Sequence, residues 1–299
     1  MCQMLPKHNK NGKIMKIGIV GLGLIGGSLG RTIVNRTQHT VYAFDLDDNA
    51  MKTGALLKAY HEVLSDDNAG EMDLMIFALY PKALKIALKE YCPKLKEGCV
   101  ILDCCGNKRS VVEVMKELAF SFPTLEFIGA HPMAGREFSG VKHSTATLYD
   151  RASMILVPVK ADIRTLAFIK QFSLEIGFGS VVITTADKHD EIIAYTSQLA
   201  HVVSSSYIKS PTAQQYLGFS AGSFRDMTRV ARLSPEMWSQ LMMENSDNLI
   251  REIAIMIEKL QEYSSALEKG DMEQLKVLLA DGNEKKLSAE KAKNSKINV

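Results

Sequence analysis

The residues with the clearest chemical meaning in this 299-residue sequence are three glycines, Gly21, Gly23 and Gly26, spaced as G-x-G-x-x-G. They follow a short apolar run, Lys16–Gly21, and open a helix predicted over Ile25–Val34. In that context the first glycine permits a tight turn, the second lets a pyrophosphate approach the backbone, and the third allows the helix to pack closely on the strand. The helix N-terminus offers free N–H groups and a positive dipole end to the phosphates. We therefore expect a dinucleotide to bind at this loop.

An acidic residue at the end of the next predicted strand bears on which dinucleotide binds. Asp45 ends the run Thr40–Asp45, about 20 residues after the loop, where a carboxylate accepts hydrogen bonds from the adenosine ribose. Asp47 and Asp48 follow closely and no arginine does, so a 2′-phosphate would meet clustered negative charge. NAD is therefore favoured over NADP, although Asp45 taken alone could be a turn residue. The predicted cofactor site consists of Gly21, Gly23, Leu24, Ile25, Gly26 and Asp45.

Histidine and arginine side chains later in the sequence could move a proton and hold an acid. Histidine is the usual group for proton transfer near neutral pH, and arginine binds a carboxylate through two parallel hydrogen bonds. Taken alone, His131 before Pro132 could be a satisfied polar group in a turn. Arg225 beside Asp226 could equally form an ion pair at a helix end. The residue types therefore leave a structural role open for both.

The first half of the sequence alternates short apolar runs with helical segments. This alternation predicts βαβ units and a mostly parallel sheet with both faces covered. The expected strands are Lys16–Gly21, Thr40–Asp45, Leu74–Leu79, Val100–Asp103, Glu126–Gly129, Ser153–Pro158 and Ser180–Thr184, and the expected helices between them include Ile25–Val34, Asp48–Ala59 and Pro81–Lys89.

The second half is predicted to be helical, because no segment after Thr184 has the pattern of a strand. One helix is expected over Asp187–Lys209, capped by its first aspartate, and a long amphipathic helix over Pro235–Glu268. Gly270 ends the latter, another helix begins at once, and the lysine-rich tail from Asp281 is expected to fray.

These elements predict an α/β protein of two domains. A Rossmann-type NAD-binding domain occupies residues 1–184, with residues 1–13 as a loose tail, and an all-helical substrate and dimerisation domain occupies residues 185–299. The cofactor should lie over the carboxyl ends of the strands, with the substrate between the domains.

Composition excludes several other classes. The chain is 46% hydrophobic and 23% charged, with a net charge of +2, which gives no reason to expect nucleic acid or an anionic membrane as partner. No uninterrupted apolar stretch reaches the ~18 residues of a membrane helix. The five cysteines form no C-x-x-C pair, so neither a metal site nor a disulfide framework is expected, and a reducing cytoplasmic location fits.

Several segments together resemble the prephenate/arogenate dehydrogenase family. The resemblance covers about residues 16–279 and is carried by the loop GLGLIGGSLG, by GAHPMAGRE at 129–137, KHD at 188–190, SQLAH at 197–201 and GSFRDMTR at 222–229. It implies an oxidoreductase of tyrosine biosynthesis that oxidises prephenate with NAD. A hydride leaves the ring carbon that bears the hydroxyl, and the ring carboxylate departs as carbon dioxide. Arogenate enzymes do the same on the amino-acid form, and either would work as a homodimer.

The resemblance also implies roles for five residues. His131 matches the catalytic histidine, Arg225 the anchor of a substrate carboxylate, and Glu137 an active-site carboxylate. His201 and His189 match polar positions of the substrate pocket. One of these two histidines could be structural, and His189 is the better candidate because it lies near the start of its helix.

One segment departs from the family pattern. Members usually carry Asp-x-Gly-Ser-x-Lys after the fourth strand, with the serine holding the catalytic histidine or the substrate hydroxyl, whereas this chain has Gly106 at the serine position. Either Asn107, predicted here as a catalytic-site residue, supplies the contact, or water does. Two alternatives stay open beside the arogenate enzyme: a 3-hydroxy-acid or imino-acid dehydrogenase of the same plan, and a weakly catalytic sensor that binds NAD and a metabolite.

Overall fold

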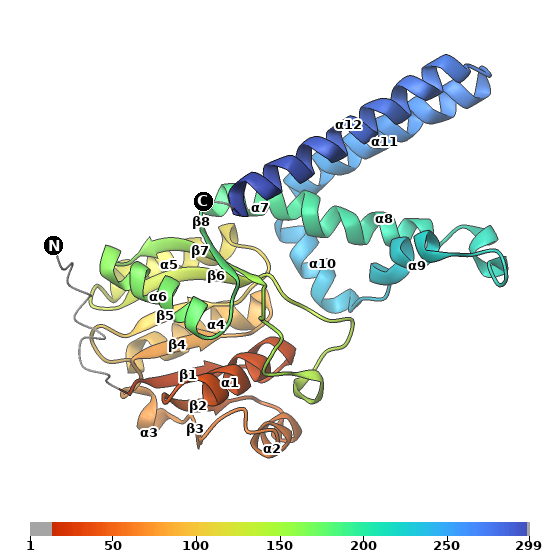
Figure 1. The fold of residues 1–299 in the computed structure, drawn as a ribbon. Helices are drawn as coiled ribbons and strands as arrows, with labels where there is room; N and C mark the ends of the chain where they lie inside the picture. The colour runs from red at the N-terminus through yellow and green to blue at the C-terminus, as the bar shows by residue number, and fades with distance from the viewer. Residues whose placement is uncertain (1–13, 298–299) are drawn as a thin grey trace. The chain divides into compact units, whose positions relative to one another are not determined.

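The computed structural model of the chain describes residues 14–297, so the predicted loose tail at residues 1–13 lies outside the described part. An eight-stranded sheet has the order β3-β2-β1-β4-β5-β6-β7-β8 (Figure 1). All neighbouring strands pair in parallel except β6 and β7, which are antiparallel. The strands are β1 Lys16–Val20, β2 Thr40–Phe44, β3 Glu62–Val63, β4 Leu74–Phe77, β5 Val100–Asp103, β6 Glu126–Pro132, β7 Ser153–Lys160 and β8 Ser180–Ile183.

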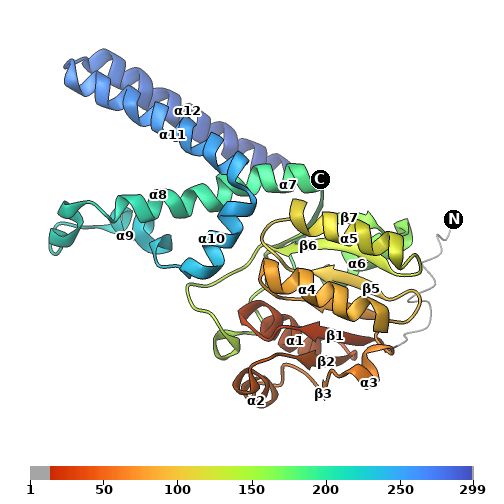
Figure 2. The same ribbon diagram turned by 180° about the vertical axis from the view of Figure 1, so that it is seen from behind.

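The central strands are buried on both faces, as parallel strands between helical layers must be. Every residue of β4 and of β5 is buried. Helices α1 (Leu24–Arg36) and α6 (Ile163–Glu175) contribute apolar side chains to the core on one face. Helices α4 (Pro81–Tyr91) and α5 (Arg109–Ser121) do so on the other, where Figure 2 shows them side by side. The predicted mostly parallel sheet with covered faces is therefore confirmed.

Some small elements carried no signal in the sequence. Strand β3 has two residues, both exposed, which is too short to show an alternating pattern. It is followed by α3 (Asp66–Ala69), a single turn with a capping box at Ser65. Helix α2 (Asp48–Leu56) has Asp47 as N-cap and ends before the predicted Ala59.

By their contacts the residues form two units, one ending at Asn245 and the other beginning at Ser246. The helical segments from 186 to 245 thus group with the sheet, and the boundary predicted near residue 184 stays a prediction. These segments are α7 Ala186–Ile193, the π-helix η4 Ala194–Leu199, α8 Ala200–Tyr207, α9 Gly222–Thr228 and α10 Pro235–Glu244. Thr185, not Asp187, caps α7, because its hydroxyl accepts from the N–H of Lys188.

The helix predicted over Pro235–Glu268 is two helices, which corrects the sequence-based expectation. It is interrupted at Asn245, after which α11 runs over Ser246–Glu268. The Asn245 side chain is fully buried and donates to the carbonyl of Asp190 and to Gln198 Oε1, both at 2.9 Å. A hydrophobic stripe can pass through such a break unchanged, so periodicity alone could not reveal it.

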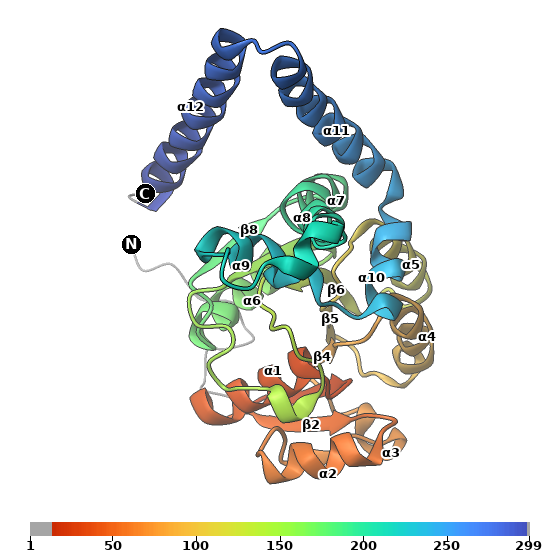
Figure 3. The same cartoon turned by 90° about the vertical axis from the view of Figure 1, so that its right-hand side faces the viewer.

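The second unit is a pair of helices, α11 and α12 (Met272–Ile297), joined at Gly270 (Figure 3). The Tyr263 hydroxyl donates to the carbonyl of Leu278 at 3.2 Å. The expectation that the tail frays from Asp281 is wrong, since α12 continues past it with ion pairs one turn apart, such as Lys286 to Glu290.

Candidate active site

The glycine loop has the geometry that its spacing predicts. Gly21 has φ of +96°, and a Cβ there would lie 2.5 Å from the carbonyl oxygen of Ala78. A Cβ on Gly26 would lie 1.9 Å from the carbonyl oxygen of Gly21, so neither position accepts a side chain. A Cβ on Gly23, in contrast, would have no protein atom within 4 Å, which leaves the backbone open to close approach by a ligand. Gly23 is also the N-cap of α1, so the first free N–H groups of that helix lie beside this opening.

Asp45 follows β2, and its carboxylate accepts hydrogen bonds from the glycine loop and from its own turn. Its Oδ2 accepts from the N–H of Leu22 at 2.6 Å, and its Oδ1 accepts from the N–H of Asp47 at 2.9 Å. Each carboxylate oxygen has a second lone pair, so these bonds leave acceptor capacity for ribose hydroxyls. The predicted contact with the ribose stays a prediction, and holding the loop is a further role.

The loop lies where the sheet topology changes direction. From β1 the chain continues to β2 and β3 on one side and then crosses to β4 on the other. Ligands of such sheets bind outside the carboxyl ends of the strands at this switch point. Gly21 follows β1, Cys104 follows β5 and His131 lies near the end of β6, so all three stand at the same edge.

The most organised polar group at this edge is a chain of three side chains. His131 Nδ1 lies 2.9 Å from His189 Nε2, and His189 Nδ1 lies 2.6 Å from Asp190 Oδ1. His131 is half-buried, whereas His189 and Asp190 are buried. The strand β6 and the helix α7 thus bring together residues that are 58 positions apart.

The N-terminus of α5 binds Asp190, the last residue of this hydrogen-bonded series. Asp190 Oδ1 accepts from the N–H of Lys108 at 2.7 Å, and Oδ2 accepts from the N–H of Arg109 at 2.9 Å. No side chain of α5 itself caps that helix, so Asp190 satisfies two of its free donors. A carboxylate there also meets the positive end of the helix dipole.

A second buried pair lies next to the first. Lys108 Nζ forms an ion pair with Asp103 Oδ2, and neither side chain is exposed. Asp103 Oδ1 also accepts from the N–H of Ala130 at 3.0 Å, directly before His131. Two buried charges that neutralise each other in this way hold the end of β5 against the end of β6.

These surroundings favour neutral imidazoles. Burial lowers the pKa of His131 well below its usual value, and His189 and Lys108 lower it further. Burial also lowers the pKa of His189, outweighing the hydrogen bond that His189 donates to Asp190, which raises it. Burial alone would raise the pKa of Asp190, but hydrogen bonds from His189 and from the backbone of α5 hold it below its usual range. A neutral imidazole at His131 is what a general base requires.

Asn107 does not occupy the place of the missing serine. Its Nδ2 donates to the carbonyl of Leu241 at 2.6 Å, and its Oδ1 accepts from Gln198 Nε2 at 3.0 Å. A Cβ on Gly106 would lie 3.2 Å from a methyl carbon of Leu241. Asn107 therefore ties the turn after β5 to α10 and the π-helix, rather than contacting His131.

The remaining predicted residues lie on the segments around α8 and α9. His201 Nδ1 donates to the carbonyl of Val230 at 2.8 Å, and its ring packs on Trp238 with the centroids 3.8 Å apart. Glu137 is exposed and lies 3.7 Å from Arg229. Within residues 14–297 no hydrogen bond or ion pair joins either residue to His131.

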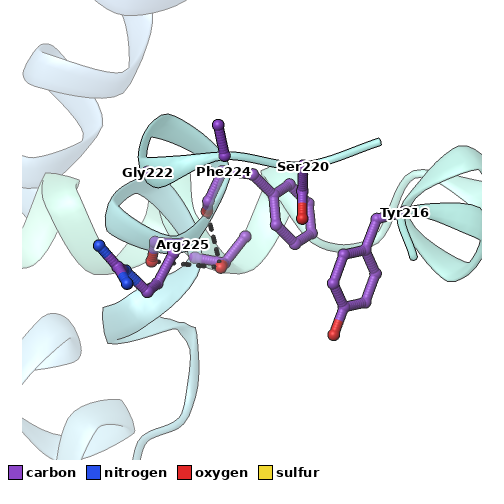
Figure 4. A pocket seen from close by; sticks show the side chains of 7 residues that line it. Tyr216, Ser220, Gly222, Phe224 and Arg225 are labelled. Atoms are coloured by element: carbon purple, nitrogen blue, oxygen red, sulfur yellow. Dashed lines mark hydrogen bonds between the residues drawn. The ribbon is translucent and has the colours of Figure 1, made fainter. Parts of the chain in front are cut away.

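Arg225 lies on α9 and lines a cavity of about 490 Å³ with Tyr216, Ser220, Phe224, Thr228 and two small residues (Figure 4). Its side chain is 82% exposed, with Asp226 4.0 Å away. In Figure 4 the guanidinium and the Tyr216 ring lie at opposite ends of this group. The volume falls in the range of small-molecule sites. Across the described residues no hydrogen bond or ion pair links Arg225 to His131, so its predicted role as carboxylate anchor stays a prediction.

Asp190 is the functional candidate that residue-by-residue reasoning missed. The sequence offers one signal, its place directly after His189 in the segment KHD. Its two partners, the N–H groups of Lys108 and Arg109 at the start of α5, are more than 80 positions away, and no local sequence pattern predicts this contact.

Comparison with known proteins decides the family. The family model described as "Prephenate dehydrogenase, nucleotide-binding domain" matches residues 29–183, and the one described as "Prephenate dehydrogenase, dimerization domain" matches residues 185–281. The chain belongs to the prephenate dehydrogenase family. It is therefore an NAD-dependent dehydrogenase, and the glycine loop described above fits that cofactor.

Three relatives show how far the similarity extends. A cyclohexadienyl dehydrogenase of Zymomonas mobilis is 30% identical over 265 residues, which cover 85% of this chain and 89% of the relative. A prephenate dehydrogenase of Lactococcus lactis is 28% identical over 281 residues, covering 89% of this chain and 75% of the relative. The solved prephenate dehydrogenase of A. aeolicus, in complex with hydroxyphenyl propionate and NAD+, shares the fold with a TM-score of 0.79 at 22% identity, covering 93% of this chain and 99% of that one.

Two further structural findings bear on the expectations from composition. No helix of residues 14–297 is long and apolar enough to cross a membrane. Over the same residues no group of three His, Cys, Asp or Glu side chains is arranged to hold a metal ion.

Proposed function

We propose that the chain is a prephenate dehydrogenase, which oxidises prephenate with NAD and releases carbon dioxide to give 4-hydroxyphenylpyruvate. The observation that carries this proposal is the position of His131 at the carboxyl edge of the sheet, the edge that also bears the glycine loop. Burial lowers the pKa of His131 well below its usual value, which favours the neutral form of a base. Its Nδ1 is engaged by His189, so Nε2 is the nitrogen left for a substrate hydroxyl.

The proposed chemistry has two linked events. The glycine loop would hold NAD, which when bound would supply the acceptor for the hydride of the ring carbon that carries the hydroxyl. His131 Nε2 takes the hydroxyl proton as the hydride leaves and returns it to the same oxygen as carbon dioxide departs. The electron pair of the broken C–C bond completes the aromatic ring, which drives the second event. A base of this kind contributes about 10²–10⁴-fold to the rate.

Arg225, His201 and Glu137 are proposed to hold the rest of the substrate. Arg225 provides a guanidinium for a carboxylate, and neighbouring Ser220 and Thr228 line the same cavity. His201 has its Nδ1 bound to the protein, which leaves Nε2 as an acceptor. Each assignment is testable by its effect on KM.

The preference for prephenate over arogenate is supported by the name of the Lactococcus lactis relative, whereas the name of the Zymomonas mobilis relative specifies neither substrate. The deciding experiment follows NADH absorbance with prephenate, arogenate and 4-hydroxyphenyllactate as separate substrates. We expect the highest kcat/KM with prephenate. A higher value with arogenate would reassign the substrate, and NAD binding without turnover of any of the three would favour a sensor.

We also propose that the protein is a homodimer built through its C-terminal helices. Large apolar side chains on α11 and α12 are exposed in the single chain, among them Ile250, Ile257, Leu260, Leu267 and Val277. Covering such a surface is a common reason for association. Light scattering at assay concentrations should give twice the mass of the chain, and a monomer would refute the proposal.

A further inference from the structure

The environment of His189 does not suit a residue that binds substrate. Only 2% of the residue is exposed, and both ring nitrogens already face protein partners, His131 on one side and Asp190 on the other. A substrate ligand needs a free ring nitrogen that points into the site. His189 has none, so its predicted role in the substrate pocket requires another explanation.

We propose that His189 and Asp190 are positioning residues that fix His131 in the tautomer with an unprotonated Nε2. This inference rests on the proposed role of His131 as the base. It gives the two buried residues a function in the reaction although neither touches the substrate.

With both histidines neutral, the hydrogen bonds allow only one placement of the protons on their ring nitrogens. Asp190 is an acceptor at Oδ1, so the nitrogen of His189 that lies 2.6 Å away must carry a proton. In neutral His189 the other nitrogen, Nε2, is then a lone-pair acceptor. The atom that donates to it is His131 Nδ1, at 2.9 Å. With the proton of His131 on Nδ1, its Nε2 presents a lone pair, as proton abstraction requires.

The surrounding charges support this order. Asp190 is held in place by the two backbone N–H groups at the start of α5, from Lys108 and Arg109. The Arg109 guanidinium lies 3.4 Å from Asp190 Oδ2, and the Lys108 ammonium is paired with Asp103. The carboxylate is thus kept ionised and in one orientation, which fixes it as an acceptor.

The hydrogen bonds from His131 to His189 and from His189 to Asp190 also stay in place when His131 becomes protonated. When His131 Nε2 takes the hydroxyl proton, the ring becomes an imidazolium whose Nδ1–H still donates to His189. The negative charge of Asp190 lies one imidazole further on and acts against the burial and the Lys108 charge, which disfavour the cation. Doubly protonated His189 would reverse the order, because its Nε2–H would occupy His131 Nδ1 and force the proton of neutral His131 onto Nε2.

The direct test reads the protonated nitrogens in the full-length wild-type protein at neutral pH. Ring ¹⁵N NMR of histidine-labelled protein separates N–H from lone-pair nitrogens, and His131→Asn and His189→Gln assign the two residues. We expect Nδ1–H and bare Nε2 at both His131 and His189. A proton on His131 Nε2 overturns the proposal. This readout does not depend on turnover, so it holds even if the enzyme acts on neither prephenate nor arogenate.

Kinetics on three variants test the functional consequence. In Asp190→Asn the amide can face His189 in two ways. If its NH₂ donates to His189, both histidine tautomers are reversed, and if its oxygen accepts, the negative charge is lost. In either case kcat should fall by about 10²–10⁴-fold. His189→Gln keeps an acceptor oxygen for His131 Nδ1–H and should retain much more activity than His189→Leu. KM for the substrate should stay within about threefold in all of them.

The matched control is Glu191→Gln, which removes one negative charge from a half-exposed position next to Asp190 on α7, where Glu191 pairs with Lys188. It should leave kcat and KM unchanged. A rise in KM with unchanged kcat in the His189 variants would return this residue to the substrate pocket and overturn the proposal. Equal activity of His189→Gln and His189→Leu would do the same, and circular dichroism verifies that each variant is folded.

Discussion

Gly106→Ser would introduce after β5 the serine expected from the resemblance to the family, and the structure predicts that the change costs stability. A Cβ at this position would lie 3.2 and 3.3 Å from the two methyl carbons of Leu241, closer than ordinary contact. Leu241 is 8% exposed and packed in the core on the α4 and α5 face, so its methyl groups have little room to retreat.

Two effects of opposite sign set the magnitude of this change. Replacing a glycine stiffens the unfolded chain and stabilises by about 0.4–1 kcal/mol where the backbone allows it. Overpacking a core costs about 1–3 kcal/mol. We therefore expect Gly106→Ser to lower the free energy of unfolding by about 1 kcal/mol. Leu241→Ala, which costs about 2–5 kcal/mol alone, should abolish that loss and make the serine neutral or mildly stabilising.

The assay is a double-mutant cycle on Gly106 and Leu241. Urea unfolding can be followed by the fluorescence of Trp238, the single tryptophan of the sequence, which lies one turn before Leu241 on α10. The coupling between the two sites should be about 1–2 kcal/mol. Additive effects, or a stabilising Gly106→Ser in the wild-type background, would refute the argument that Leu241 fills the space of the serine.

Four further outcomes follow from the site. His131→Asn should lower kcat by several hundred-fold or more, since base catalysis contributes about 10²–10⁴-fold, with NAD affinity by titration nearly unchanged; equal losses in both would contradict the role of base. Arg225→Ala should mainly raise KM in steady-state assays, and an unchanged KM would remove it from the site. Asp45→Ala should reduce the ratio of kcat/KM for NAD to that for NADP, because the contact with the ribose is lost. It should also loosen the loop at Leu22, whose N–H loses its acceptor. An unaltered ratio would show that Asp45 only holds the loop and does not contact the ribose. Folding lowers the pKa values of His131 and His189. At a pH below about 6.5, the usual pKa of histidine, the unfolded chain therefore binds more protons than the folded protein does. Urea titrations should therefore show the free energy of unfolding falling between pH 7.5 and 5.5, and an equal fall in His131→Asn would exclude His131 as a contributor.

The parts of the site that the sequence predicts are those set by local spacing. Gly21, Gly23 and Gly26 act within one turn, so their pattern predicts the strand, loop and helix that the structure contains. The carboxyl edge could also be predicted, because parallel strands align their ends. His131 therefore lies at the same edge of the sheet as the glycine loop as a consequence of strand direction.

The parts that the sequence does not predict depend on partners from distant segments. Asn107 was expected to face the catalytic histidine, but Gln198 and Leu241 take its hydrogen bonds. Asn245 breaks an amphipathic helix because its side chain is needed by Gln198 and by the carbonyl of Asp190. Spacing rules describe one element at a time, and a buried amide is satisfied by whichever element the fold brings to it.

Asp190 shows why such distant contacts matter for function as well as for the fold. Helix α5 has no capping side chain of its own, and Asp190 on α7 supplies one from 81 and 82 positions away. The same carboxylate orients His189, and through it His131. The position and tautomer of the proposed base therefore depend on how α7 packs on α5. A change that weakens this packing should lower kcat before it unfolds the protein, because His131 loses its orientation as soon as the cap is lost.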